Sequence, residues 1–220
     1  MADSMVTRGS ELRILHLTSA HRLDDVRIRI KICRTLAGKY DEVHLAGPGG
    51  DEASSDAVIV HKISSPRNRL HRMAITTLAL MVKAVKLRPN LVHVHDPELL
   101  PVAIILRTFG IVVVYDAHED LVSQVGCKSW IPVMVQPVAR TFARVVNWIS
   151  GRTVSAVITA TPAIAACFPQ QKTSLVRNFP IVREFPTVSP SDYFHRKDRI
   201  IYAGGLSWKR GLQEMVAAMR

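Results

Sequence analysis

Polar side chains that could do chemistry stand at the ends of two apolar runs in the middle of the chain. Imidazole and carboxylate groups can hydrogen-bond sugar hydroxyls, move protons or bind metal ions. The run 91–95 ends at His95 and Asp96, and the run 111–115 is followed by Asp116, His118, Glu119 and Asp120. Both runs are rich in β-branched residues, which predicts two buried strands.

The segment between these runs predicts a helix that crosses from one strand to the next. Leu99 to Phe109 is apolar nearly all round, Pro97 precedes it and Gly110 can end it. A strand, a crossover helix and a strand make the two strands parallel, and ligands of open parallel sheets bind beyond the carboxyl ends of the strands. The residues that this arrangement places in one crevice are His95, Asp96, His118 and Glu119.

The same alternation extends over most of the chain. Further strands are predicted at 13–18, 42–46, 58–63, 156–160 and 173–176. Further helices are predicted at 26–37, 70–87, 137–149 and 162–167. Strands that alternate regularly with helices predict the α/β class, here a doubly wound parallel sheet.

The helical pattern at 70–87 carries an apolar stripe with basic residues at its ends and flank. Such a stripe is usually the core-facing side of a crossover helix, and this is the interpretation we favour. A helix with basic edges can also lie on an anionic lipid surface, and that alternative stays open.

Composition divides the chain into four parts. Residues 1–12 are polar, and we expect a disordered tail there, whereas residues 13–178 hold the α/β pattern. Residues 179–198 contain Pro180, Pro186 and Pro190 among serines and charges, which predicts an interdomain linker. Residues 199–220 begin a new strand and helix. Two elements cannot bury their own apolar faces, so they either open a second, truncated α/β domain, which we favour, or fold back onto the first domain as a tail.

The chain is strongly basic, with 29 Lys and Arg against 18 Asp and Glu and a net charge of +11. This charge suits an anionic membrane surface or a phosphorylated substrate, and no nucleic-acid-binding module pattern accompanies it. The three cysteines are far apart, as expected for free thiols in a reducing compartment. No signal peptide or long apolar span occurs. We therefore expect a cytoplasmic protein that is soluble or peripherally membrane-associated.

Five motifs, in this order, resemble the N-terminal half of a glycosyltransferase of the two-Rossmann GT-B architecture, in the large retaining family numbered four. They are HVHDPELLP at 93–101, VVYDAHED at 113–120, ITATPAIA at 158–165, LVRNFP at 175–180 and IIYAGGLSWKRGLQEMVAAM at 200–219. The stretch TSAHRLDDVRI at 18–28 also resembles the acceptor-side first loop of one subgroup. The resemblance covers almost the whole chain from Ile14 onward.

The resemblance implies roles for residues on the acceptor side. It implies that His118 is the catalytic-site residue that contacts the donor sugar and the acceptor, with Glu119 beside it. A neutral imidazole at a strand end can hydrogen-bond a sugar hydroxyl, and a nearby carboxylate can fix its tautomer. The remaining substrate-binding residues that we expect are Asp25, Arg27, His95 and Asp96. The Asp96-Pro97 pair equally makes a good helix start.

For the donor, the resemblance implies that four residues grip the diphosphate of a nucleotide sugar, which is the co-substrate; no metal or other cofactor is implied. These residues are Gly204, Gly205, Lys209 and Arg210. The pattern departs from many relatives, which have an arginine at the position of Gly205 and a lysine at that of Arg210. The acidic pair that holds the donor ribose and sugar in such enzymes would lie beyond Arg220, so we expect negligible transfer by this chain alone.

The resemblance thus implies a hexosyltransferase of polysaccharide biosynthesis that acts on a glycan or a lipid-linked acceptor. Two alternatives stay open. A metal-dependent hydrolase could use His93, His95, Asp116 and His118, because imidazole and carboxylate ligands suit zinc or manganese. A non-catalytic module could bind an acceptor or a membrane through its basic helices. The sequence does not specify the sugar, the acceptor or the oligomeric state.

Overall fold

The computed structural model describes residues 12–50, 57–127, 131–185, 194, 197, 199–204 and 210–219. The chain divides into two compact units, Met1–Asn178 and Phe179–Arg220, and each is described by itself.

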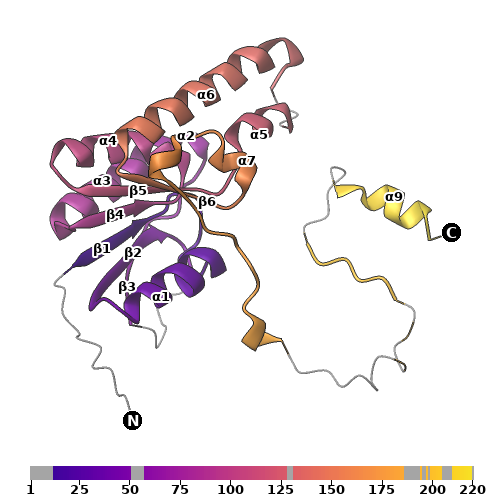
Figure 1. Cartoon of the computed structure of the whole chain (residues 1–220), viewed down its shortest axis with the longest axis horizontal. Helices are drawn as coiled ribbons and strands as arrows, with labels where there is room; N and C mark the ends of the chain where they lie inside the picture. The colour runs from indigo at the N-terminus through magenta and orange to yellow at the C-terminus, as the bar shows by residue number, and fades with distance from the viewer. Residues whose placement is uncertain are drawn as a thin grey trace. The chain divides into compact units, whose positions relative to one another are not determined.

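The first unit is built on a sheet of seven parallel strands in the order β3-β2-β1-β4-β5-β6-β7 (Figure 1). The strands are β1 (Arg13–Leu17), β2 (Glu42–Pro48), β3 (Val58–Ile63), β4 (Leu91–Val94), β5 (Val112–Ala117), β6 (Ala156–Thr159) and β7 (Thr173–Leu175). All seven strands expected within residues 13–178 are present, and the predicted parallel pairing of β4 with β5 is confirmed.

Helical segments connect the strands. They are η1 (Val26–Cys33), α1 (Arg34–Ala37), α2 (Arg69–His71), η2 (Arg72–Thr76), α3 (Thr77–Leu87), η3 (Pro97–Leu99), α4 (Leu100–Thr108), α5 (Leu121–Cys127), η4 (Val133–Val135), α6 (Gln136–Thr153), α7 (Pro162–Ala165) and η5 (Gln170–Lys172). Of these, η1 and η2 are π-helical, and η3, η4 and η5 are short 3₁₀ turns. Together with the sheet they make the predicted doubly wound α/β fold.

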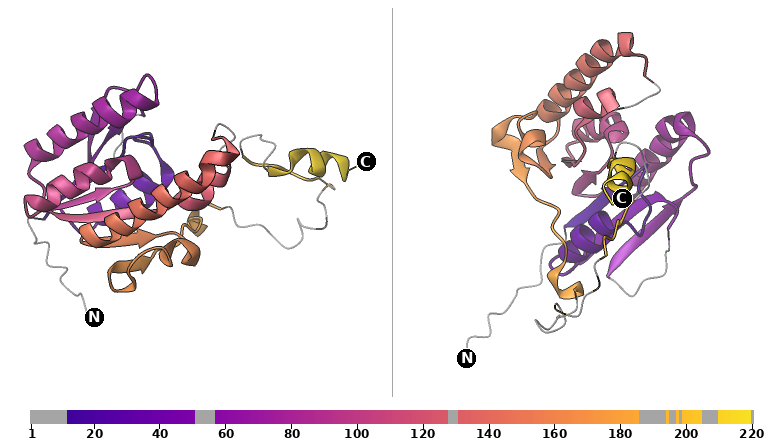
Figure 2. Two further views of the ribbon diagram at one scale, coloured as in Figure 1. Left: turned by 90° about the horizontal axis from the view of Figure 1, so that it is seen from above. Right: turned by 90° about the vertical axis from the view of Figure 1, so that its right-hand side faces the viewer.

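Two hydrophobic clusters hold the helices to opposite faces of the sheet. On one face, Leu15 and Val92 pack with Leu80 of α3 and Leu106 of α4. On the other face, Leu45 packs with Ile28 and Cys33 of η1. Figure 1 shows α3, α4 and α6 on one side of the sheet and α1 on the other. Seen from above, α4 runs between α3 and α6 (Figure 2).

The strand order reverses between β1 and β4, which are neighbours in the sheet. The connection after β1 leads to β2 on one side, whereas β4 continues to β5 on the other. Such a switch point leaves a crevice at the carboxyl ends of the two strands, where ligands of open α/β sheets bind. The polar residues singled out from the sequence follow β1, β4 and β5 at this edge.

The favoured interpretation of the stripe at 70–87 is wrong for most of its residues. The sheet buries Thr77, Leu80 and Ala84 of α3. Much of the apolar surface is exposed, namely Leu70, Met73, Ile75, Leu78, Val82 and Val85. The reason is geometric, because one side of a helix can face the sheet and the apolar residues of this segment extend around more than one side.

Helix α6 has its apolar side outward as well. Its buried residues are small or polar, namely Ala143, Asn147, Ser150 and Gly151. Its exposed residues include Val138, Phe142, Val145, Trp148 and Ile149. No helix in the described parts of the chain is both long enough and apolar enough to cross a membrane.

In the second unit the described elements are the turn η6 (Val182–Glu184) and the helix α9 (Leu212–Ala217). Residues 199–203 belong to no strand, whereas the sequence led us to expect one there. A strand needs a neighbour to satisfy its backbone N–H and C=O groups, and no described residue of this unit provides one.

Candidate functional site

Asp96, at the end of β4, organises the loop that follows β1. Its Oδ2 atom accepts hydrogen bonds from Thr18 Oγ1 at 2.7 Å, from the backbone N–H of Ser19 at 2.7 Å and from that of Ala20 at 3.2 Å. Its Oδ1 atom lies 3.0 Å from His21 Nδ1. Asp96 makes no side-chain capping bond to the turn that begins at Pro97. Its role is therefore to fix the loop of the neighbouring strand.

The Asp96–His21 pair favours the charged forms of both groups. The hydrogen bond to Asp96 raises the pKa of His21 from its ordinary value. Burial alone would raise the pKa of Asp96, but hydrogen bonds from His21 and Thr18 outweigh it and hold that pKa well below its usual range. Asp96 is thus a carboxylate that fixes the orientation of the His21 imidazole.

His118, after β5, lies beside His21, with 5.2 Å between the ring centroids. His118 Nδ1 donates to the backbone carbonyl of Asp116 at 3.2 Å. This bond requires a proton on Nδ1, so the neutral imidazole carries a lone pair on Nε2. The structure therefore brings His21, Asp96 and His118 together at the edge of the sheet, from the ends of three strands.

Arg27 of η1 pairs with the buried carboxylate of Asp116. Its Nε and Nη2 atoms donate to Asp116 at 3.1 and 2.7 Å. The side chains are 12% and 0% exposed, respectively. Burial alone would raise the pKa of Asp116. The hydrogen bonds from His95 and Arg27 lower it by more, so the net pKa is well below its usual range and the carboxylate stays ionised. Arg27 thus links η1 to β5 through a buried ion pair.

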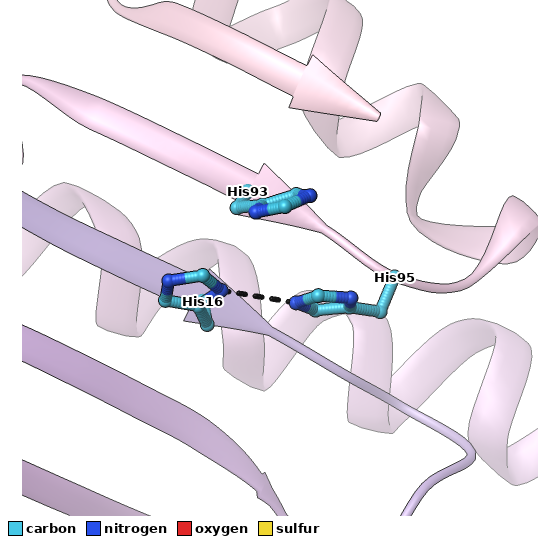
Figure 3. Close-up of side chains that lie close together, drawn as sticks. All are labelled: His16, His93 and His95. Carbon is cyan, nitrogen blue, oxygen red and sulfur yellow. Dashed lines mark hydrogen bonds between the residues drawn. The ribbon is translucent and has the colours of Figure 1, made fainter. Parts of the chain in front are cut away.

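A chain of hydrogen bonds runs from Asp116 into the sheet. His95 Nδ1 lies 3.1 Å from Asp116 Oδ2. On its other side, His95 Nε2 lies 3.0 Å from His16 Nδ1, and Figure 3 shows this contact. The carboxylate can only accept, so His95 carries its proton on Nδ1 and accepts at Nε2 from the Nδ1–H of His16. His93 stacks on His95, with ring centroids 4.5 Å apart.

Two histidines of this hydrogen-bonded cluster, His16 and His93, are neutral. Burial lowers the pKa of His93 to about 3 and holds that of His16 well below its ordinary value. The Nε2 atoms of both rings are buried without a hydrogen-bond partner. With the proton of His16 on Nδ1, its unpartnered atom is a lone pair rather than an N–H.

Among the residues that the structure describes, three of these histidines lie close enough together to hold a metal ion. The ligand atoms of His16, His93 and His95 lie within 4.8 Å of one another. An ion shared by His16 Nδ1 and His95 Nε2 would replace their hydrogen bond and move the His16 proton to the buried Nε2 atom, which has no acceptor there. A buried N–H without an acceptor is costly, so the hydrogen-bonded chain fits these residues better than a metal site.

The other residues expected from the sequence are distributed as follows. Asp25 caps η1, accepting from the N–H of Ile28 at 2.9 Å, and Glu119, next to His118 in the sequence, is exposed. In the second unit, a Cβ atom on Gly204 would lie 2.7 Å from Arg210 Nη1, so the guanidinium lies against this glycine. Gly205 and Lys209 lie outside the described residues.

Sequence reasoning did not single out His21 or Thr18 individually. The signal was present, since both belong to the stretch TSAHRLDDVRI. Asp96 was expected to cap a helix or bind a substrate, and nothing in its local sequence reveals donors that are 76 to 78 residues away.

An open parallel sheet with a polar site at its switch point defines a Rossmann-like ligand-binding domain. Residues 8–177 match the family described as "Glycosyl transferase 4-like domain". The chain belongs to this family of glycosyltransferases, and its fold is that of GT-B enzymes.

Two solved structures illustrate the likeness. Sucrose-phosphate synthase from Thermosynechococcus elongatus is 16% identical, with a TM-score of 0.67, over 94% of this chain and 59% of that chain. HepE from Anabaena, determined in complex with UDP and glucose, is 17% identical, with a TM-score of 0.53, over 82% of this chain and 48% of that chain. This chain thus spans about half the length of these structures. No curated protein sequence matches it significantly.

Proposed function

We propose that this chain provides the acceptor side of a hexosyltransferase, which moves a sugar from a nucleotide-diphosphate sugar to a glycan or a lipid-linked acceptor. One observation carries the proposal. His118 is anchored through Nδ1 to the carbonyl of Asp116, at the crevice edge of a sheet of the glycosyltransferase family. Its Nε2 atom is left to hydrogen-bond a sugar hydroxyl, as the family resemblance implies for this residue.

The buried neighbours act by positioning. His95 and Asp96 are 1% and 3% exposed, and their polar atoms are engaged with His16, Asp116 and the loop after β1. We propose that both residues position the site rather than contact the substrate. Arg27 has the same positioning role, because it pairs with Asp116. Glu119 and the imidazoles of His21 and His118 remain as the groups that contact the acceptor.

For the donor, we propose that Gly204, Gly205, Lys209 and Arg210 bind the diphosphate. The contact of the Arg210 guanidinium with Gly204 supports this, because a glycine lets a phosphate approach the backbone and a guanidinium binds it bidentately. Sucrose-phosphate synthase and the UDP complex of HepE share the fold, which is consistent with a nucleotide sugar as co-substrate.

We further propose that the exposed side of α6 contacts an anionic membrane. The helix carries Arg140, Arg144 and Arg152 and no acidic residue. Its apolar side is exposed rather than packed on the sheet. An apolar stripe flanked by arginines is typical of helices that lie in the headgroup region, and it would bring a lipid-linked acceptor close to the protein.

The acceptor-side assignment is tested by calorimetric titration of the chain with methyl glycosides of glucose, galactose, mannose and N-acetylglucosamine. We expect saturable binding of at least one glycoside, weakened about tenfold in H118Q by the loss of one hydrogen bond. H44Q is the matched control, because His44 lies in β2 and pairs with His61. Equal affinities of H118Q and the unmodified chain would contradict the proposal.

A further inference from the structure

Arg72 forms a second ion pair at the crevice edge, with Glu98 of the turn after β4. Its Nη2 atom donates to Glu98 Oε2 at 3.1 Å, and its Nε atom faces Oε1 at 2.5 Å. Glu98 Oε1 also accepts from Ser19 Oγ at 2.7 Å. Ser19 belongs to the loop after β1, which Asp96 holds through the backbone N–H of Ser19. The Arg72 guanidinium is therefore fixed beside the loop that carries His21.

A wide helical turn fixes the backbone of Arg72. Segments α2, η2 and α3 follow one another without a break, and η2 is π-helical from Arg72 to Thr76. The carbonyl of Arg72 accepts the backbone N–H of Thr77, five residues further on, and Thr77 Oγ1 donates to the same carbonyl at 3.1 Å. Turns of π-helix are rare and occur frequently at functional sites. Here the turn carries the arginine that reaches the crevice edge.

The ion pair engages one edge of the Arg72 guanidinium and leaves the other edge. Nε and Nη2 face the two oxygens of Glu98, so the second edge consists of Nη1 and the remaining hydrogen of Nη2. No described residue forms a hydrogen bond with Nη1. The side chain of Arg72 is 30% exposed, whereas that of Glu98 is 12% exposed. A guanidinium binds phosphate bidentately through such an edge.

The segment around Arg72 carries only positive charge. Residues 57–95 contain seven Lys and Arg residues and no Asp or Glu. Arg67 and Arg69, which precede Arg72 at the start of this helical segment, are exposed. The carboxylate in contact with Arg72 is that of Glu98, and the ion pair compensates its charge. An anion that reaches the second edge of the guanidinium therefore meets a positive potential.

His118 and Arg72 flank the same loop. His21 of this loop lies against His118, with 5.2 Å between the ring centroids. Ser19 of the same loop contacts Glu98, the partner of Arg72. The two loop residues are two positions apart, which is at most about 7 Å along the chain. A ligand that lies along this stretch meets an imidazole at one end and a guanidinium at the other.

We propose that Arg72 binds a phosphate group attached to the acceptor sugar, so that the acceptor is a glycosyl phosphate or diphosphate rather than an uncharged glycan; this rests on the proposed function. Two phosphate oxygens accept from Nη1 and Nη2 of Arg72, and a hydroxyl of the same sugar bonds to His118 Nε2. Glu98 is a positioning residue, because it holds the guanidinium against the loop. A lipid-linked acceptor carries such a phosphate between its sugar and its lipid.

Calorimetric titration of the chain with paired ligands tests this assignment. Each methyl glycoside of glucose, galactose, mannose and N-acetylglucosamine is compared with the corresponding glycosyl phosphate. We expect a sugar that binds as its glycoside to bind at least tenfold more tightly as its phosphate, because charge-assisted hydrogen bonds are added. This gain should shrink as the salt concentration is raised. Inorganic phosphate and glycerol phosphate represent free phosphate and a lipid headgroup, and both should bind at least tenfold more weakly than the glycosyl phosphate.

Two variants and one spectrum locate the phosphate. R72Q should lose the gain and keep the affinity for the methyl glycoside. K86Q is the matched control, because it removes one exposed positive charge near the other end of the same helical segment, and it should keep the gain. In the unmodified chain, the ¹⁵N signal of Arg72 Nε, assigned with R72K, should shift with the glycosyl phosphate and not with the methyl glycoside. This spectrum decides the question if R72Q is too unstable to titrate.

The outcomes separate the two proposals. A glycosyl phosphate that binds no more tightly than its methyl glycoside, a gain that R72Q retains, or an unchanged Arg72 signal overturns the phosphate assignment while the acceptor side stands. Equally tight binding of inorganic phosphate or glycerol phosphate also overturns it, because the sugar then plays no part. Absence of binding by every methyl glycoside and every glycosyl phosphate overturns the proposed function and the phosphate site with it.

Discussion

Arg27 and Asp116 form a two-point ion pair that joins η1 to β5 across 89 residues of sequence. Both Asp116 oxygens are engaged by Arg27, and one of them also meets His95 at 3.1 Å. His118 Nδ1 lies 3.7 Å from Asp116 Oδ2 and donates to the backbone carbonyl of the same aspartate. The shape of the crevice therefore depends on a buried electrostatic contact.

Removing the guanidinium should destabilise the fold strongly. In R27M the buried Asp116 carboxylate loses its charged partner, and the expected loss in the free energy of unfolding is about 3–5 kcal/mol. Urea denaturation measures this loss. The matched control is R22M, because Arg22 pairs with Asp24 in an exposed position and should matter little. Similar losses in the two variants would show that the Arg27 pair is not stabilising.

Stability should fall on acidification because of three histidines, of which His16 and His93 are buried and His61 is partly buried. Burial lowers the pKa of His93 to about 3 and that of His61 to about 4 in the fold, and holds that of His16 well below 6.5, the ordinary value. Below pH 6.5 the unfolded chain therefore binds protons that the native chain does not. Each such histidine costs about 1.4 kcal/mol per pH unit as the pH falls toward its native pKa.

Urea unfolding at several pH values between 6.5 and about 4 measures this slope. H93Q should reduce it by the contribution of one histidine. H21Q should leave it unchanged, because the pKa of His21 is raised and its stabilising contribution is complete below 6.5 and lost only as the pH rises through its native value. A slope that H93Q does not alter would mean that His93 is protonated in the fold.

Substitution of Gly50, which follows β2, by alanine should destabilise the fold more than the same substitution of Gly110, a glycine of the same conformation. Gly50 and Gly110 have φ angles of 77° and 78°. A Cβ atom on Gly50 would lie 2.8 Å from the backbone N of Leu23, whereas one on Gly110 would have nothing within 4 Å. G110A should cost about 1–2 kcal/mol from the left-handed conformation alone, and G50A clearly more. Equal thermal shifts would show that the loop after β1 moves without cost.

Membrane contact by α6 is tested with sedimenting vesicles. The unmodified chain should bind vesicles of phosphatidylglycerol and not vesicles of phosphatidylcholine. Serine at Val138, Phe142 and Val145 should abolish binding with little loss of stability, because these side chains are exposed in the fold. The matched control places serine at Leu70 and Met73 of the other exposed stripe. Loss of vesicle binding only in that control would show that α2 and η2, rather than α6, contact the membrane.

Much of the fold could be predicted because it follows from local patterns. Runs of β-branched residues marked the strands, and Asp25 and Thr161 cap the helices that follow them. Helix α5 was missed although its signal is local, since Asp120 accepts from the backbone N–H of Val122 and Ser123. Its apolar positions are too few to give a clear helical period.

The remainder depends on contacts that are distant in sequence. The motifs predicted that His118 and Asp96 lie at the same edge of the sheet. The pair between Asp96 and His21 forms only when the loop after β1 folds onto the end of β4. Likewise, the apolar residues of α3 and α6 do not reveal which side the sheet will cover, because packing rather than periodicity decides it.

The central claim is that the crevice edge near His21 and His118 binds the acceptor sugar. The most direct measurement is long-range ¹H–¹⁵N NMR of the histidine side chains during titration with methyl glycosides. We predict saturable shifts of the His21 and His118 imidazole signals, with those of His44 and His61 on β2 and β3 unchanged. Shifts confined to His44 and His61, or none at His21 and His118 with a glycoside that binds, would contradict the account.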